Sequence, residues 1–398
     1  MTDWKPPRHV LPVIVIAQFA CTSLWFAGNA VVDGLVQSLE VGPRYVAHLT
    51  SAVQLGFITG TLTFALLTIA DRFSPSRVFF WSALAGALAN CGVLMPANTE
   101  ITILGWRFLT GFFLAGIYPV GMKIAADYHQ RGLGKALGYL VGALVIGTAL
   151  PHGLRTFTGQ IAWQPVMWGT SVLAVIGGLL ILLAVGDGPF RKKANRPDLG
   201  AFFRVFRIRD FRSAAFGYFG HMWELYSFWA FVPVLLASYM QLRPGVAFNI
   251  PAWSFAVIGI GGLSCIAGGY VALKRGSATV AFWALLASGL CCLLVPFSFG
   301  LPPILFLAFL LIWGIVVIAD SPQFSTLVAG TAPSEHIGTA LTIVNCVGFA
   351  ITIFSMQLLG HLQEAFGTRS IYVVLVVGPL FGLSALFSLY RKRRRSAT

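Results

Sequence analysis

Residues 111–119 read Gly-Phe-Phe-Leu-Ala-Gly-Ile-Tyr-Pro, and residues 314–322 read Gly-Ile-Val-Val-Ile-Ala-Asp-Ser-Pro, with the same spacing from glycine to proline inside an apolar segment. The two segments lie about 203 residues apart, and nearly the same offset relates Gly134-Lys-Ala-Leu137 to Gly338-Thr-Ala-Leu341. A shared offset of this length indicates two homologous halves rather than a solenoid of short repeats.

The composition is that of a membrane protein. Hydrophobic residues make up 57% of the chain and charged residues 10%, whereas a soluble domain has roughly a quarter of charged residues. A helix that crosses a bilayer needs about 20 mostly apolar residues. Runs of that length predict an all-α protein with twelve membrane-spanning helices, which begin near Val10, Tyr45, Val78, Ile101, Ala136, Trp163, Ser213, Trp253, Ser277, Pro303, Thr339 and Ile371.

The distribution of basic residues predicts the orientation. With both termini inside, the inner segments hold 21 of the 27 lysines and arginines, as the positive-inside rule requires. We therefore expect a multi-pass protein of the bacterial inner membrane with both termini cytoplasmic. The first apolar run is too long for a cleavable signal and is expected to continue as a span.

The predicted spans form two bundles of six helices, residues 1–185 and 213–398, joined by a basic cytoplasmic segment over residues 186–212. The part of this linker over residues 201–212 mixes aromatic and basic side chains. This mixture is typical of a helix lying on the membrane surface, although a partly ordered basic linker accounts for it equally well.

Several classes of function are disfavoured by the sequence. The excess positive charge lies beside the ends of spans, where anionic lipid explains it better than nucleic acid does. The six cysteines lie within predicted spans without metal-binding spacing. There is no HExxH motif or nucleophile elbow for a membrane-embedded enzyme, and only short loops for a sensor. We expect a monomer without metal or cofactor.

The architecture resembles the major facilitator superfamily. Twelve spans in two parallel halves carry a charged turn after the second span, where Asp71, Arg72 and Arg77 match the family's cytoplasmic motif. A second similarity is the arginine in the fourth span, Arg107, which is followed by the glycines and proline of residues 111–119. The family's glycine-rich motif in the fifth span is matched only loosely.

The resemblance implies alternating access, in which two bundles rock about a substrate site near the middle of the bilayer. Asp71 and Arg72, with Arg77, would help to close the cytoplasmic side. Lys123 and Asp127 lie four residues apart at the inner end of the fourth span. They form either a local pair or a further part of that gate.

A charge inside a span is costly and is by default a functional candidate. Arg107 lies about two turns into the fourth span, and Asp33 lies at a similar depth in the first. Arg107 could bind an anionic substrate or influence a proton site, whereas the structural alternative is an ion pair with Asp33.

Proton coupling is predicted from the second half. Glu224 lies near the middle of the seventh span, and His221 precedes it by three residues on the same face of the helix. Histidine exchanges protons near neutral pH, so the two residues could take up and release protons. The alternative is a Glu224 that is permanently neutralised and serves packing. Asp320, beside Pro322, could act as a gate, substrate contact or second proton site, or could reach the inner interface.

The leading hypothesis is a secondary transporter that moves a small organic solute, with anions among the candidates, together with protons. The main alternative is a proton-driven exporter; a membrane-embedded enzyme or a sensor is remote. Nitrate is rejected, because the second and eighth spans lack the arginines that related nitrate transporters use. Seven aromatic residues lie at cavity depth, and about half of them are expected to line the cavity: Trp25, Phe26, Tyr118, Trp223, Tyr226, Trp229 and Trp313. Of these, Trp25, Tyr118, Trp223, Tyr226 and Trp313 are candidates for contact with the solute.

Overall fold

The computed structural model describes residues 6–40, 42, 44–129, 133–158, 163–191, 204–333, 336–366 and 369–395. All regular structure in these ranges is helical. Ten helices are long and apolar enough to cross a membrane within this part of the chain, so the prediction of a multi-pass α-helical membrane protein is confirmed at that level.

Within its described residues, the first half of the chain, up to residue 185, forms ten α-helices and one π-helical turn. Their bounds are α1 Val10–Thr22, α2 Ala27–Ala30, α3 Val32–Leu39, α4 Tyr45–Leu66, α5 Ile69–Arg72, α6 Pro75–Gly92, α7 Glu100–Leu114, α8 Tyr118–Tyr128, α9 Leu133–Thr158, α10 Gln164–Leu180 and the π-helical turn Ile181–Val185.

The second half is also helical. Their bounds are α12 Arg209–Leu242, α13 Ile250–Arg275, α14 Ser277–Ser298, α15 Pro303–Val316, α16 Ser321–Thr331, α17 Ile337–Phe366, a 3₁₀ turn Ile371–Val376 and α18 Val377–Arg395. The surface helix considered for residues 201–212 falls partly outside the described residues, and its last four residues already belong to α12.

The repeated segments have the same structural role in both halves. Each contains a helix break, between α7 and α8 and between α15 and α16, with Pro119 and Pro322 in the first turn of the second helix. Each also contains a glycine at a close helix crossing. A Cβ atom on Gly111 would lie 2.0 Å from the carbonyl oxygen of Val53, and one on Gly314 would lie 2.0 Å from that of Val257. Only glycine fits at such a distance.

Two predicted spans differ from simple membrane helices. The first is divided into α1, α2 and α3, because the chain leaves helical geometry at Phe26 and Val31. The expected continuous first span is therefore corrected. The third, α6, has 18 residues but is not apolar enough to count among the ten, since Arg77 and Asn90 lower its mean hydropathy.

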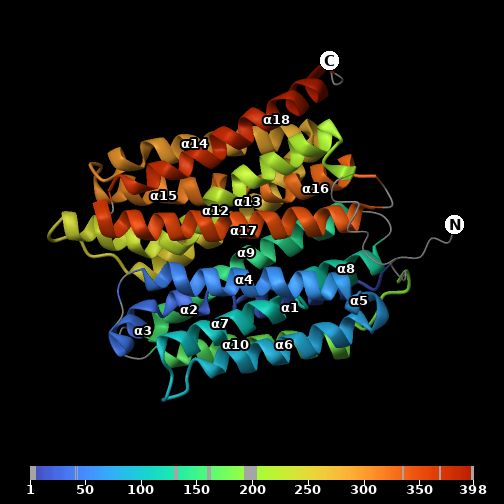
Figure 1. Cartoon of the computed structure of the whole chain (residues 1–398), viewed down its shortest axis with the longest axis horizontal. Helices are drawn as coiled ribbons and strands as arrows, with labels where there is room; N and C mark the ends of the chain where they lie inside the picture. Colours follow the sequence, from blue (N-terminus) through green and yellow to red (C-terminus); the bar gives the residue numbers. More distant parts are fainter. Residues whose placement is uncertain are drawn as a thin grey trace.

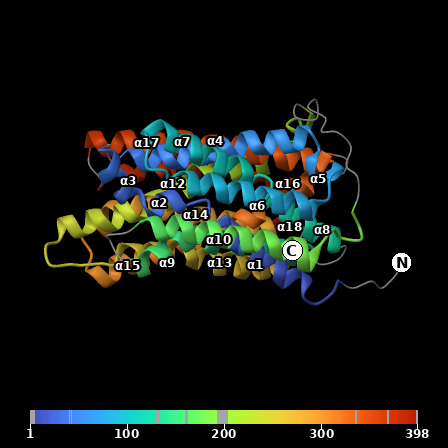
Figure 2. The ribbon, with the colours of Figure 1, turned by 90° about the horizontal axis from the view of Figure 1, so that it is seen from below.

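The helices run side by side along one direction (Figure 1). The start of α1, α5 and the end of α18 lie at one end of the bundle, which we call the terminal end; α3 and the start of α4 lie at the opposite end (Figures 1 and 2). The first half packs against the second mainly through α9 on α13 and α4 on α17. These two contacts place the broken first span beside α12.

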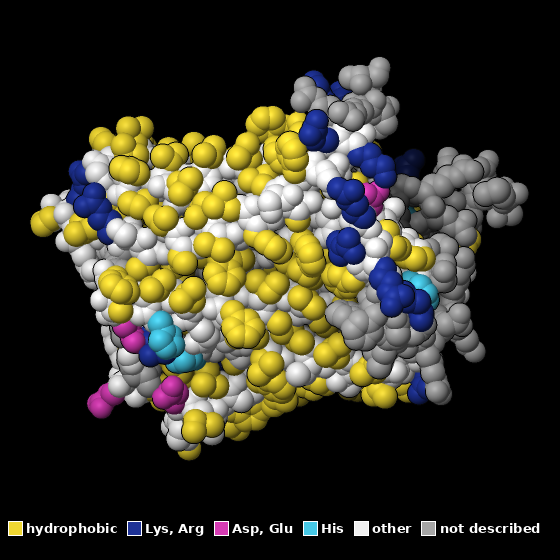
Figure 3. Space-filling model, turned by 45° about the horizontal axis from the view of Figure 1, so that its top comes forward, with side chains coloured by type: hydrophobic (Ala, Val, Ile, Leu, Met, Phe, Trp, Pro, Cys, Tyr) yellow, Lys and Arg dark blue, Asp and Glu magenta, His cyan; other side chains and the backbone are white. Residues whose placement is uncertain are grey.

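The surface fits a bilayer. Figure 3 shows hydrophobic side chains covering the middle of the molecule, with lysines and arginines toward its two ends. Large apolar side chains such as Trp81, Leu88 and Phe297 are exposed on the molecule. Exposed apolar surface of this extent is expected where lipid, rather than water, is the solvent.

Candidate functional site

Glu224 is buried inside the second half, where three helices meet. Its side chain extends from α12, and the residue is 1% exposed. The indole Nε1 of Trp313 on α15 donates to Glu224 Oε1 at 2.6 Å, and the Ser288 hydroxyl on α14 donates to Oε2 at 2.9 Å. Both partners are uncharged, so they solvate the carboxyl group but do not neutralise it. The sequence nominated Glu224 and Trp313 separately and gave no indication that they bond.

His221 is paired with Asp320 rather than with Glu224. His221 Nδ1 lies 2.9 Å from Asp320 Oδ1, and both side chains are almost completely buried. Asp320 therefore does not reach the membrane interface, which was one of its predicted alternatives. The break between α15 and α16 places Asp320 just before the first turn of α16. Among the described residues, the second half thus contains two buried acidic side chains, one hydrogen-bonded to neutral donors and one paired with histidine.

Arg107 holds the broken first span in place. It is fully buried, and its two terminal nitrogens donate to Asn90 Oδ1 at 2.8 Å and to the carbonyls of Leu24 and Trp25 at 2.9 and 2.6 Å. These carbonyls lie just beyond α1, where helical partners are missing. The considered pair with Asp33 is not formed, because Asp33 is exposed on α3.

Asn90 is a residue that the sequence reasoning missed. Its amide nitrogen lies within hydrogen-bonding distance of the Met167 carbonyl and of the hydroxyls of Thr170 and Ser171 on α10, while its oxygen accepts from Arg107. An asparagine in the middle of an apolar span was the available signal, because a buried amide needs partners.

The predicted aromatic residues fall into two groups. Trp25 and Tyr226 join the halves: the Trp25 ring centroid lies 5.9 Å from that of Tyr226 and 5.6 Å from that of Phe349. Phe26 meets Trp229 at 6.2 Å, and Tyr118 is half-buried at the start of α8. Trp223 belongs to the other group, since it borders a shallow apolar hollow between α12, α17 and α18. Trp313 belongs to neither group, because its indole N–H donates to Glu224.

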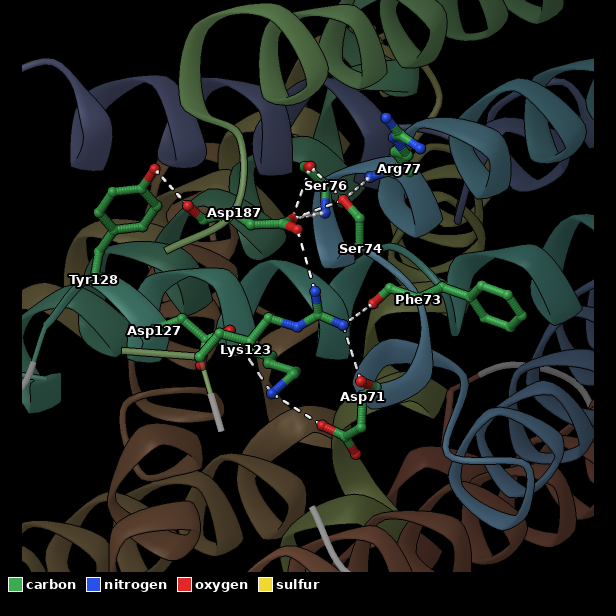
Figure 4. A network of polar contacts seen from close by, with 10 residues as sticks. Asp71, Phe73, Ser74, Ser76, Arg77, Lys123, Asp127, Tyr128 and Asp187 are labelled. Atoms are coloured by element: carbon green, nitrogen blue, oxygen red, sulfur yellow. Dashed lines mark hydrogen bonds and ion pairs between the residues drawn. The ribbon is translucent and has the colours of Figure 1, made fainter. Parts of the chain in front are cut away.

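A polar network closes the terminal end of the first half (Figure 4). Lys123 Nζ lies 3.0 Å from Asp71 Oδ1 and 3.7 Å from Asp127 Oδ2. Among the described residues, the side chains of Arg72 and Arg77 take no part in this network, and Figure 4 shows the Arg77 side chain turned away from it. The charge that faces Asp71 therefore comes from Lys123, four residues before Asp127 on α8.

Asp187 fastens the end of the sixth predicted span to the turn after α5. It accepts hydrogen bonds from the Ser74 hydroxyl at 2.8 Å and from the Ser76 hydroxyl and amide at 2.8 and 3.0 Å. Arg191 lies 3.4 Å from Asp187 and donates to the carbonyls of Asp71 and Phe73.

The environment of Asp187 favours its charged form. Burial by itself raises the pKa of this carboxyl, but the hydrogen bonds from Ser76 and Ser74 and the charge of Arg191 outweigh it. The net result is a pKa of Asp187 below its usual value. The network thus holds a carboxylate at the surface of the terminal end.

The opposite end carries polar contacts between the halves. Arg44 Nη1 lies 3.1 Å from Glu364 Oε2, and its Nη2 lies 2.8 and 3.0 Å from the two ring nitrogens of His361. Gln357 on α17 donates to the Ser51 hydroxyl on α4 at 2.8 Å. None of these residues was nominated from the sequence, because single polar residues of this kind have no distinguishing local pattern.

Metal and disulfide chemistry find no support in the described residues. No group of three or more His, Cys, Asp or Glu side chains there could hold a metal ion. All six cysteines are free.

Comparison with known proteins identifies the family. The model of the Major Facilitator Superfamily matches residues 14–356. The chain is similar to the inner membrane metabolite transport protein YgcS of Escherichia coli (strain K12), with 27% identity over 39% of this chain and 34% of the relative. It is also similar to the probable galactarate/D-glucarate transporter GarP of the same strain, with 24% identity over 45% of this chain and 42% of the relative.

These alignments span less than half the length of either relative. Among solved structures, the human organic anion transporter MFSD10 (TETRAN) superposes over 96% of this chain and 100% of its own, with a TM-score of 0.74 and 14% identity. At that identity the likeness concerns the fold alone.

Proposed function

Since this chain belongs to the Major Facilitator Superfamily, we propose that it moves a small organic solute across the membrane by alternating access and couples this movement to protons. The observation that carries the coupling is the pair of buried acidic sites in the second half, Glu224 and the His221–Asp320 pair. A buried carboxyl held by uncharged donors changes its proton occupancy when water reaches it.

The proposed topology has twelve spans with both termini in the cytoplasm of a bacterium, in two bundles over residues 1–185 and 213–398. The ten apolar helices are joined in this count by α6 and by the broken first span. The gathering of basic residues at the terminal end supports its cytoplasmic position. We propose that the protein works as a monomer in the inner membrane, since Glu224, the His221–Asp320 pair and Arg107 all find their partners within one chain.

Alternating access is supported by the distribution of the ion pairs among the described residues. At the opposite end, the pairs Arg44–Glu364 and Ser51–Gln357 join the two halves. At the terminal end, the ion pairs of Asp71, Lys123 and Asp127 lie within the first half, and a contact of 3.4 Å between the Tyr139 and Tyr270 hydroxyls connects the halves. The two bundles could therefore separate at the terminal end while staying closed at the other. The Asp71 network would contribute to gating by stabilising the cytoplasmic end of the first bundle.

Arg107 is proposed as a brace and not as a substrate contact, because its terminal nitrogens are occupied by Asn90 and the α1 carbonyls. Its role would be to keep the broken first span in position beside α12, where Trp25 meets Tyr226. The solute then contacts the aromatic groups of both halves.

Export in exchange for protons is the second candidate, because the buried acidic sites serve either direction equally. Both directions are tested in proteoliposomes that enclose a pH-sensitive dye, with a panel of metabolites and drugs added outside. Uptake with protons predicts acidification of the interior when a transported solute is added. Export predicts proton movement opposite to the solute. A solute flux without any proton movement would contradict the coupling proposal.

A further inference from the structure

His361 is an exposed histidine on α17 that contacts the first half at the opposite end of the molecule. Arg44 Nη2, at the start of α4, lies 2.8 Å from His361 Nε2 and 3.0 Å from its Nδ1. The Nδ1 atom also lies 3.0 Å from the carbonyl oxygen of Gln357, one turn earlier on α17. A carbonyl only accepts and a guanidinium only donates. A neutral ring that carries its proton on Nδ1 and accepts from Arg44 at Nε2 satisfies both partners.

These contacts lie where α4 and α17 approach each other closely. A Cβ atom on Gly360 would lie 3.3 Å from that of Ala47 and 3.8 Å from Arg44 Cγ. Arg44 Nη1 also pairs with Glu364 Oε2 on α17 at 3.1 Å. Arg44 therefore connects the first half to two side chains of α17, and we call Arg44, His361 and Glu364 the Arg44 cluster. Figure 3 shows basic, acidic and histidine side chains together at this end.

A second proton on His361 changes the Arg44 cluster. The protonated ring donates from both nitrogens and can no longer accept from Arg44. Its positive charge then lies about 3 Å from the guanidinium, and the two charges repel each other. Glu364 follows His361 by three residues, a spacing at which oppositely charged side chains pair within one helix. Protonated His361 thus competes for Glu364, and Arg44 loses both partners on α17.

The other titratable groups around the Arg44 cluster do not offer such a change. The main neighbours of α17 are α4, α12, α16 and the 3₁₀ turn Ile371–Val376. Among the described residues, the charged and histidine side chains of α12 lie between Arg209 and Glu224, nearer the terminal end, and α16 has none. The loop residues Arg243 and Arg369 donate to backbone carbonyls. The titratable side chains that these neighbours place at the opposite end are Tyr45, His48, Tyr239 and Tyr372. Tyrosine ionises far above neutral pH, and His48 makes no hydrogen bond or ion pair with the cluster in the described structure.

We propose that protonation of His361 from the outer solution releases the Arg44 cluster and favours opening of the opposite end. In the proposed topology this end faces the outside, and the exposed ring exchanges protons near neutral pH, whereas Glu224 is buried. Acid outside then favours the state that takes up solute and proton. An exposed ion pair is weak, but two states of similar free energy respond to a several-fold change. This inference rests on the proposed alternating access and adds a group through which the outer pH acts on it.

Distances measured by double electron–electron resonance test the opening without transport. Nitroxide labels are attached to Gln37→Cys on α3 and Ala365→Cys on α17, both exposed. Cys91, the one cysteine that is not buried, is replaced by serine. In lipid nanodiscs, we expect the fraction of molecules with the longer distance to rise at least about threefold between pH 8 and pH 5. His361→Gln stays neutral and should keep the fraction found at pH 8, whereas Arg44→Ala should give a high fraction at every pH.

The matched control is His9→Gln, the same substitution at an exposed histidine of the terminal end, which should respond to pH like the wild type. An unchanged pH response in His361→Gln, or loss of the response in His9→Gln as well, would overturn the assignment to His361. Wild-type distances that do not change with pH would overturn the proposal as a whole. Proton-driven uptake by a protein with such constant distances would reject this inference alone and leave the proposed function intact.

Discussion

Arg107 is the residue whose proposed role differs most from its first interpretation. If it braces the first span, Arg107→Ala leaves Asn90 and two carbonyls unpaired and should lower the free energy of unfolding by about 3 kcal/mol. Arg107→Lys should recover only part of this loss, since the lysine ammonium cannot reproduce the planar set of donors of the guanidinium group. Thermal unfolding in detergent measures both, with the exposed Arg275→Ala as control. An Arg107→Ala protein of normal stability would return Arg107 to the substrate site.

Asp187 provides a pH-dependent prediction at the same scale. Because its folded-state pKa lies below the unfolded value, which is about 3.9, its network contributes stability above that pH and loses the contribution as the pH falls through the folded pKa. Asp187→Asn should lower the stability by about 1 kcal/mol at neutral pH. The difference in stability between Asp187→Asn and the wild type should disappear in acid. Unfolding midpoints measured across this range would contradict the account if the difference stayed constant.

The sequence could nominate the buried charges but not their partners. Arg107, Glu224 and Asp320 stand out because charges in apolar spans are rare. His221 and Glu224 share a helix face, yet the histidine meets Asp320, almost a hundred residues further along the chain. Such pairings depend on how α12 and α16 pack against each other. A single sequence does not show which residues of two distant helices come into contact.

At the scale of helices, the two repeated glycines should behave alike. Gly111→Ala and Gly314→Ala each force a methyl group against a neighbouring backbone carbonyl, so both variants should be destabilised by about 1 to 3 kcal/mol. Gly105 on α7 has no atom within 4 Å of an added Cβ. Gly105→Ala should therefore be neutral or slightly stabilising. Equal stability of all three variants would mean that the crossings adjust without cost.

The same helices show which breaks a sequence reveals. The breaks before α8 and α16 follow from the prolines at 119 and 322, because proline interrupts helical hydrogen bonds. The break in the first span has no proline between Thr22 and Ala27. It is stabilised instead by Arg107 from another helix, and a local pattern cannot predict a tertiary contact of that kind.

At the scale of the whole molecule, alternating access requires the opposite end to open. Ala47 and Gly360 face each other across α4 and α17, and a Cβ on Gly360 would lie 3.3 Å from that of Ala47, close to disulfide geometry. The double variant Ala47→Cys, Gly360→Cys should form a disulfide on oxidation, stop transport and recover with reductant. Each single variant should transport normally under both conditions. Full transport by the cross-linked protein would exclude opening at this end.

Proton coupling of the whole transporter through Glu224 is tested by gradient-driven uptake by Glu224→Gln in proteoliposomes. Glutamine preserves the shape of the side chain and can keep the bonds to Trp313 and Ser288, so the variant should fold. Glu100→Gln, at an exposed position, is the control. With a solute selected by thermal stabilisation of the protein, we expect Glu224→Gln to lose accumulation against a gradient but to keep solute exchange. Accumulation at the wild-type rate in Glu224→Gln would contradict proton coupling through Glu224.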